Sequence, residues 1–241
     1  MSALAVMFIA VGLADIGRRL TDRLWLGVAI APVAVVVTAA LAGLWHLGDI
    51  ALLVIALAAS VAWSVLCARA ERTGGREVAP LALFGGAVGL LIVLSGWASD
   101  VAGLVARWPA WVGLSIDPDR LLMVIGVVLL QLVTGNLLVR LVLGSVGAVK
   151  PEGEPQPSDK LKGGRLLGPM ERLLILGLGL AGQLAAATLV VAAKSIVRFP
   201  EINAQKAREN GGIGIDEVTE YFLVGSFASW ILALGGLALA Q

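Results

Sequence analysis

The sequence ERLLILGLGLAGQLAAATLVVAAKSIVR, residues 171–198, decides the fold class of this chain. It is an apolar run with a charged pair at each end, Glu171 with Arg172 and Lys194 with Arg198. A continuous helix over this run would be about 40 Å long, because each residue adds about 1.5 Å. That length matches a bilayer with its headgroups, so we expect a membrane-crossing helix with the charged pairs at opposite faces.

The flanking sequence supports a helix that starts just before this run. Gly168 and Pro169 followed by Glu171 are typical of a helix start, with proline in the first turn and an acid able to reach a free amide. Downstream, a charged connector leads to DEVTEYFLVG, residues 216–225, which begins another apolar stretch. We therefore expect two spanning helices joined by a charged connector at the C-terminal end.

The overall composition excludes an ordinary soluble domain. Of 241 residues, 59% are hydrophobic and 15% charged, and the mean hydropathy is +0.93. Repeated apolar runs of about 20 residues are what a bilayer requires. A net charge of +1 gives no indication of nucleic-acid binding, and one His with one Cys, Cys67, leaves no His/Cys metal cluster and no internal disulfide. The prediction is an all-α polytopic transmembrane helical bundle.

Five further apolar runs precede this end of the chain, which gives about seven spans, six to seven in all. They cover residues 3–16, 24–45, 50–68, 78–97 and 121–143. The first resembles a signal peptide in length, but Arg18 and Arg19 follow it instead of preceding it, so we interpret it as a retained helix. Residues 99–120 carry Trp108, Pro109 and Trp111 and predict an interfacial helix or a partial re-entrant segment.

A Pro-rich, charged stretch, KPEGEPQPSDKLKGGR at residues 150–165, is typical of a solvated linker. It predicts three parts: N-terminal transmembrane helices over 1–149, the linker over 150–165, and a C-terminal two-helix module over 166–241. An outside N-terminus and a cytoplasmic C-terminus place twelve of the eighteen Lys and Arg residues inside. Four of the other six fall between the last two helices. Either acids in that connector hold them, or one upstream segment does not span and the end is inverted.

Three blocks in the last third, GRLLGPMERLLI, AAKSIVRFPEI and TEYFLVGS, resemble an uncharacterised family of bacterial multi-pass membrane proteins, a domain of unknown function. The resemblance implies a bacterial inner-membrane location and no established activity. A Gly-rich insert at residues 210–214 departs from the pattern. The recurring positions of the family correspond here to Arg165, Glu171, Arg172, Lys194, Ser195, Arg198, Phe199, Glu201, Glu220, Tyr221 and Phe222.

One candidate site lies at the end of the 171–198 run. Lys194 and Arg198 are four residues apart, so they share a helix face with Ser195 beside them, and could bind a lipid phosphate or the carboxylate of a partner. Glu217 and Glu220 fall in the first turn of the last helix, where the helix dipole favours acids. The alternatives are a salt-bridged clasp of Lys194 or Arg198 with Glu220, or cations that extend to the headgroups.

A second candidate is a polar pathway. The 121–143 span is unusually polar, with Gln131, Thr134, Asn136 and Arg140, and Gln183 is a strongly polar side chain within the 171–198 run. Polar groups inside a membrane either line a water-filled path or bond one helix to another. Asp15, shortly before Arg18 and Arg19, is either a proton-carrying carboxylate or, as we favour, half of a local ion pair.

Glycine motifs are interpreted as packing faces. GLGLAG, residues 177–182, matches the dinucleotide fingerprint, but that fingerprint needs a preceding strand, whereas here it falls within an apolar run. We expect close helix packing at Gly182 with Ala186 and at Gly85 with Gly89.

The sequence predicts no catalytic residue, cofactor or metal, because it contains neither a triad pattern nor a carboxylate-rich metal motif. We expect a non-enzymatic accessory or structural subunit, or a small-solute or ion pathway. Its partners would be membrane lipids and a second copy or another membrane protein. The alternative is a membrane-embedded enzyme or binding module for a lipid phosphate at the end of the chain that holds Lys194, Arg198 and Glu220.

Overall fold

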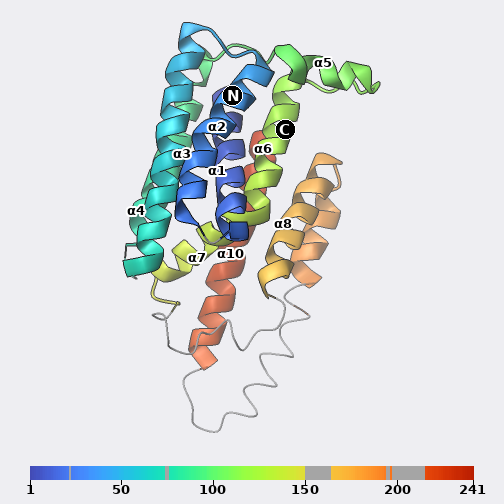
Figure 1. Cartoon of the computed structure of the whole chain (residues 1–241). Coiled ribbons are helices and arrows are strands. Elements are labelled where there is room, and N and C mark those ends of the chain that lie inside the picture. The colour runs from blue at the N-terminus through green and yellow to red at the C-terminus, as the bar shows by residue number, and fades with distance from the viewer. Residues whose placement is uncertain (22, 74–75, 150–163, 194–195, 197–214) are drawn as a thin grey trace. The chain divides into compact units, whose positions relative to one another are not determined.

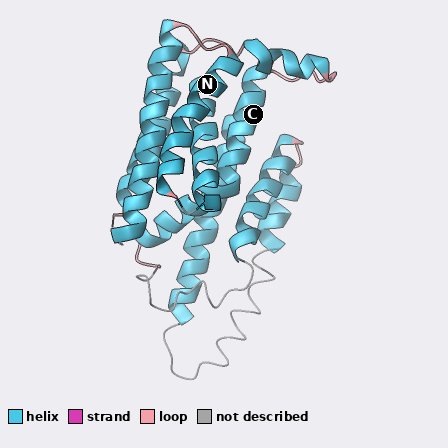
Figure 2. Cartoon of the chain, in the orientation of Figure 1, coloured by secondary structure: helices cyan, strands magenta, loops and turns pink. Residues whose placement is uncertain are grey.

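The computed structural model describes residues 1–241 except 22, 74–75, 150–163, 194–195 and 197–214. All regular secondary structure in the described part is helical, as Figure 2 shows. The all-α prediction is therefore confirmed for this part of the chain. The chain separates into two compact units, Met1–Thr134 together with Leu239–Gln241, and Gly135–Ala238.

The helices of the two units follow the apolar runs of the sequence. The first unit contains α1 Ser2–Thr21, α2 Leu24–Ala42, α3 Leu47–Thr73, α4 Val78–Val93, the 3-10 helix η1 Ser95–Trp97, α5 Gly103–Trp111, α6 Pro118–Leu129 and the π-helix η2 Leu130–Thr134. The second contains α7 Gly135–Ser145, α8 Gly164–Leu180, a short apolar helix Leu184–Ala193 and most of α10 Ile215–Ala240. The short helix α5 lies in the segment for which the sequence predicts an interfacial or re-entrant element.

Helix α1 is the centre of the first unit. It packs against α2, α3 and α6, among which it lies in Figure 1. Ten successive residues from Ser2 to Val11 are buried, as is typical of a helix that is apolar on all sides. A Cβ atom at Gly126 of α6 would lie 2.9 Å from the Ala5 carbonyl oxygen, so glycine there allows α1 and α6 to approach closely.

One end of the first unit is joined by side-chain hydrogen bonds. Asp49 accepts from the backbone and hydroxyl of Ser99 at 2.8 and 2.6 Å, and the Ser2 hydroxyl donates to the Ser99 carbonyl at 3.3 Å. Nearby in the chain, Asp119 accepts from the Val101 amide at 2.9 Å. The start of α1 therefore lies at the end of the unit where α3 and α6 begin.

Four described helices are long and apolar enough to cross a membrane. They are Trp25–Ala42, Leu47–Arg72, Pro118–Ser145 and Thr219–Ala240. These helices are compatible with a membrane protein, but they are fewer than the seven predicted spans. Helix α1 is not among them because it carries Asp15, Arg18 and Arg19, and α4 has only 16 residues.

The predicted continuous helix over 171–198 is wrong, because α8 ends at Leu180. Gly182 has φ +75°, and the Gln183 amide donates to the Leu178 carbonyl at 2.8 Å. This left-handed glycine with its paired backbone bonds is the usual C-terminal stop of a helix. The 17 residues of α8 fall short of the roughly 20 that a crossing needs, and ten residues of the helix that follows, Leu184–Ala193, are described.

The two short helices form a hairpin. Ile175 of α8, Ala187 of the following helix and Ala233 of α10 share one buried cluster, so the chain folds back after Gly182. Figure 1 shows α8 and its successor side by side. Charged groups near the two ends of the 171–198 run thus do not mark the ends of one long helix.

Two further predictions concern the glycine face of α4 and the division of the chain into parts. A Cβ atom added at Gly85 or Gly89 would have nothing within 4 Å, so the predicted packing face on α4 is not used in the described structure. Packing divides the chain after Thr134, while residues 150–163 of the predicted linker lie outside the described residues. The predicted three-part division therefore stays a prediction, although Gly164 and Arg165 already belong to α8.

Candidate functional site

Asp15 is a carboxylate buried inside the first unit, with an exposed fraction of 2%. Its Oδ2 atom accepts a hydrogen bond from the Thr134 hydroxyl at 2.7 Å and another from the Trp63 indole Nε1 at 3.1 Å. These donors come from η2 and α3, so three separate helices converge on one carboxylate. We call Asp15, Trp63, Thr134 and Arg18 the Asp15 cluster.

The Asp15 cluster is connected to the surface by ion pairs. Arg18 Nη2 lies 3.8 Å from Asp15 Oδ1, and Arg18 Nη1 donates to Glu71 Oε2 at 3.1 Å. Exposed side-chain fractions rise along this series, from 2% at Asp15 through 15% at Arg18 to 44% at Glu71. The predicted local ion pair is confirmed for Arg18, and the structure adds a carboxylate from α3 that no local spacing indicates.

The π-helix η2 presents two polar side chains to the interior of the first unit. Gln131 and Thr134 both have an exposed fraction of 0%, although the helix around them is apolar. A π-turn contains an extra residue and often occurs at functional sites, because it changes which side chains share a face. The sequence pattern contains no signal for this turn, so sequence reasoning missed the partnership of Thr134 with Asp15.

Arg172 is the corresponding buried charge of the second unit, with an exposed fraction of 1%. Its Nη2 atom donates to Asn136 Oδ1 at 2.8 Å and its Nη1 atom to the Ser229 hydroxyl at 3.2 Å. The neighbouring Glu171, also buried, accepts from the Trp230 indole Nε1 at 2.8 Å. Both charged side chains are therefore enclosed by helices, while their predicted position at a membrane interface stays a prediction.

A glycine makes room for this guanidinium. A Cβ atom at Gly135 would lie 2.8 Å from Arg172 Nε and 2.9 Å from Nη2. Such distances are shorter than ordinary van der Waals contact, so the Arg172 side chain occupies the space a larger residue would need. Arg172 thus links α7, α8 and α10 of the second unit through one side chain.

The predicted anion or clasp site falls mostly outside the described residues. Lys194, Ser195 and Arg198 are not described, and Glu217 lies in α10 with a side chain that is also not described. Glu220 is exposed on α10. Both the anion site and the clasp therefore stay predictions.

The residues of the predicted polar pathway have separate surroundings. Gln131 is buried in the first unit, whereas Asn136 of the second unit accepts a hydrogen bond from Arg172. Arg140 is exposed on α7, and Gln183 is exposed at the turn after α8. Within the second unit, Asn136 is bonded to Arg172 of a neighbouring helix. The polar pathway stays a prediction.

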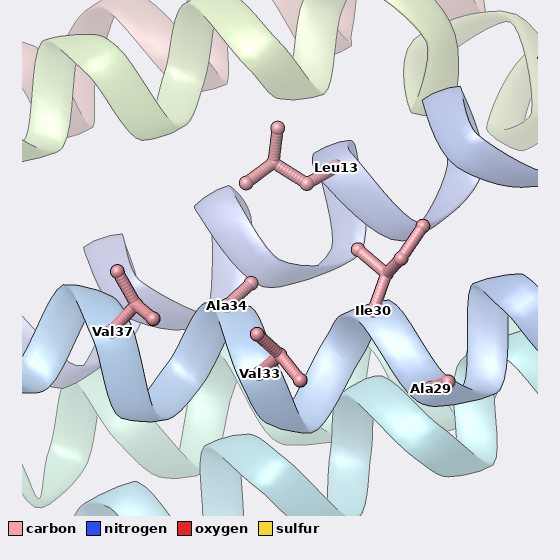
Figure 3. Close-up of a pocket in the computed structure, with 6 residues that line it drawn as sticks. All are labelled: Leu13, Ala29, Ile30, Val33, Ala34 and Val37. Carbon is pink, nitrogen blue, oxygen red and sulfur yellow. The ribbon is translucent and has the colours of Figure 1, made fainter.

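The first unit also has an open apolar groove of about 360 Å³. Figure 3 shows Leu13 from α1 and five side chains from α2 around it. The lining residues are all aliphatic: Leu13, Ala29, Ile30, Val33, Ala34 and Val37.

Searches against protein-family models, curated proteins and solved structures found no match to this chain. The resemblance of its last third to an uncharacterised bacterial membrane family therefore stays a prediction. In the described part of the chain, no three His, Cys, Asp or Glu residues lie close enough together to hold a metal ion.

Proposed function

We propose that this chain is a multi-pass protein of the bacterial inner membrane that forms a proton pathway, with Asp15 as the proton-carrying group. The observation that carries the proposal is the buried carboxylate of Asp15, held by Thr134 and Trp63. Arg18, which also pairs with the exposed Glu71, stays protonated, so it would orient the carboxylate and would not relay the proton. Ionisable side chains within membrane helices are costly, and those that occur commonly face bundle interiors and mark ion or proton paths.

The geometry favours one oxygen of Asp15 as the proton acceptor. Oδ2 already accepts from Thr134 and Trp63, whereas Oδ1 lies 3.8 Å from Arg18 Nη2, so Oδ1 is the oxygen to which we assign the proton. A proton on Oδ1 removes the charge that attracts Arg18, and the guanidinium then pairs with Glu71 alone. When Asp15 loses the proton, Arg18 again pairs with both Asp15 and Glu71. The contacts of Arg18 would therefore change with the protonation state of Asp15.

Proton flux into proteoliposomes tests this function. Wild-type protein should acidify the lumen under an imposed potassium diffusion potential, and Asp15→Asn should reduce the flux to that of protein-free liposomes. The amide oxygen of the variant can still accept from Thr134 and Trp63, so the fold should persist. Asp100→Asn, which changes an exposed acid, is the matched control and should retain the flux. A wild type without flux, or an active Asp15→Asn variant, would contradict the proposal.

We further propose that both termini face the outside of the membrane. The sequence predicts a cytoplasmic C-terminus from seven spans, but the hairpin after α8 supports six crossings. With six crossings, the four basic residues between the last two predicted spans would lie on the inner side of the membrane. Sixteen of the eighteen Lys and Arg residues would then lie on that side. Hydrogen bonding of Arg120 to Ala240 within the first unit also supports this arrangement.

Two other functions remain proposals. An accessory subunit, paired with a second copy or another membrane protein, would show no proton flux and would need its buried polar groups only for helix association. The second is a lipid-phosphate site at Lys194, Arg198 and Glu220. The salt-bridged clasp of Arg198 with Glu220, the structural alternative to that site, is tested by charge reversal at Glu220. Rescue by simultaneous reversal of Arg198 would support the clasp, and additive losses would contradict it.

A further inference from the structure

We propose that the aliphatic groove on α2 binds one acyl chain of an anionic phospholipid, whose phosphate is held by Arg19 and Arg23. The proposal is independent of the Asp15 cluster, because Arg18 is already paired with Asp15 and Glu71. It concerns a specific lipid site in the first unit and not the lipid-phosphate site predicted near Lys194.

The groove has the shape and chemistry of an acyl-chain site. Its volume of about 360 Å³ lies at the lower end of the range typical of small-molecule sites. Leu13 of α1 contributes to one wall, while Val33 and Val37 of α2 are well exposed, so a chain can enter from the side. With an entirely aliphatic lining, the groove offers hydrogen bonds to no polar ligand.

The register of α2 places a positive charge in line with the groove. Arg23 is the N-cap residue of α2, seven residues before Ile30 and fourteen before Val37. Steps of seven return to nearly the same helix face, so the groove and Arg23 share one side of α2. The distance from Arg23 to Val37 along the axis is about 21 Å, which corresponds to one leaflet with its headgroups.

Neighbouring residues mark this end of α2 as the headgroup level. Trp25 is exposed in the first turn of α2, and tryptophan is enriched at membrane interfaces. Arg19 is exposed in the last turn of α1, and residues 19–23 carry two arginines against one aspartate. A Cβ atom added at Gly27 of α2 would lie 3.5 Å from Arg18 Cβ, so the end of α1 lies next to the start of α2. This positive charge favours a phospholipid headgroup of net negative charge over a zwitterionic one.

Native mass spectrometry of the full chain in detergent tests the site with phosphatidylglycerol and phosphatidylcholine as probes. We expect the wild type to bind one phosphatidylglycerol more tightly than phosphatidylcholine. The double variant Arg19→Gln with Arg23→Gln should lose affinity for phosphatidylglycerol by about fivefold for each arginine and approach the affinity for phosphatidylcholine. Both arginines are exposed, so these changes should leave the thermal unfolding of the protein unchanged.

A second pair of variants tests the groove itself. Val33→Trp fills it and should reduce binding of both lipids, whereas Val36→Trp adds the same bulk at an exposed position of α2 that does not line the groove. Equal binding by these two variants would overturn the groove as the site. Equal affinity of the wild type for the two lipids, or an unchanged preference in the arginine double variant, would overturn the binding of an anionic headgroup by Arg19 and Arg23 and leave only non-specific surrounding lipid.

Discussion

The Nε atom of Arg120, in the first turns of α6, donates a hydrogen bond to the carbonyl oxygen of Ala240 over 3.1 Å. Because Leu239–Gln241 belong to the first unit, this bond fixes where the chain ends relative to that bundle. Ala240 lies at the end where α6 begins, which is also the end that holds Ser2. A cation at a helix C-terminus is favourable, because the last carbonyls have no partner within the helix.

Impermeant thiol reagents should reach both ends of the chain from one side of the membrane. In a Cys67→Ser background, a cysteine at Gln241 should react together with one at Leu114, which is exposed in the loop before α6. A cysteine at Leu20, exposed at the opposite end of α1, should react only from the other side. If the cysteines at positions 241 and 20 were labelled from the same side of the membrane, this would contradict the bond between Arg120 and Ala240.

The hairpin makes a second topological prediction. Cysteines introduced singly at Leu166, near the start of α8, and at Ala193, in the described part of the helix that follows, should react from the same side. Both positions are exposed, so the substitutions should not disturb packing. Reaction from opposite sides would indicate a continuous crossing helix, as the sequence pattern alone predicts.

Gly135→Ala should destabilise the second unit by about 1–3 kcal/mol, because overpacking displaces a buried side chain. The new methyl group would collide with the Arg172 guanidinium and weaken its hydrogen bond to Asn136. Gly177→Ala on α8 is the control: a Cβ atom there meets nothing within 4 Å, and alanine is the better helix former by about 1 kcal/mol. Thermal unfolding in detergent should separate the two variants, and equal melting temperatures would contradict the close approach.

Asn136→Ala should cost about 1–3 kcal/mol, because it removes an acceptor from a buried guanidinium. Arg140→Ala, one turn further along α7, changes an exposed side chain and should stay within about 0.5 kcal/mol. If the two substitutions prove equally harmful, Asn136 does not have the specific structural role that its contact with Arg172 indicates.

Thr134→Val should destabilise the protein by about 1 kcal/mol through loss of the hydrogen bond to Asp15. The effect should shrink in the Asp15→Asn background, because a bond to an ionised acceptor is stronger than one to a neutral amide. A double-mutant cycle measured by denaturant unfolding reports this coupling. Fully additive effects would show that the hydroxyl and the carboxylate act independently.

The sequence by itself indicated a membrane environment and determined the all-helical fold class. A mean hydropathy of +0.93 and repeated apolar runs predict helices, and the described chain forms helices over those runs. The pairing of Asp15 with Arg18 was also predictable, because residues three apart are neighbours on one helix. These features depend on composition and on the spacing of residues close together in the chain, and both can be read directly from the sequence.

Only the tertiary structure decided where the 171–198 run breaks and which polar groups meet. Gly182 is sterically compatible with a helix interior and with a left-handed turn, and the packing of Ile175, Ala187 and Ala233 selects the turn. The hydrogen-bond donors to Asp15 are 48 and 119 residues away, and the acceptors from Arg172 are 36 and 57 residues away. Contacts between such distant residues arise when whole helices pack together, so no local pattern in the chain specifies them.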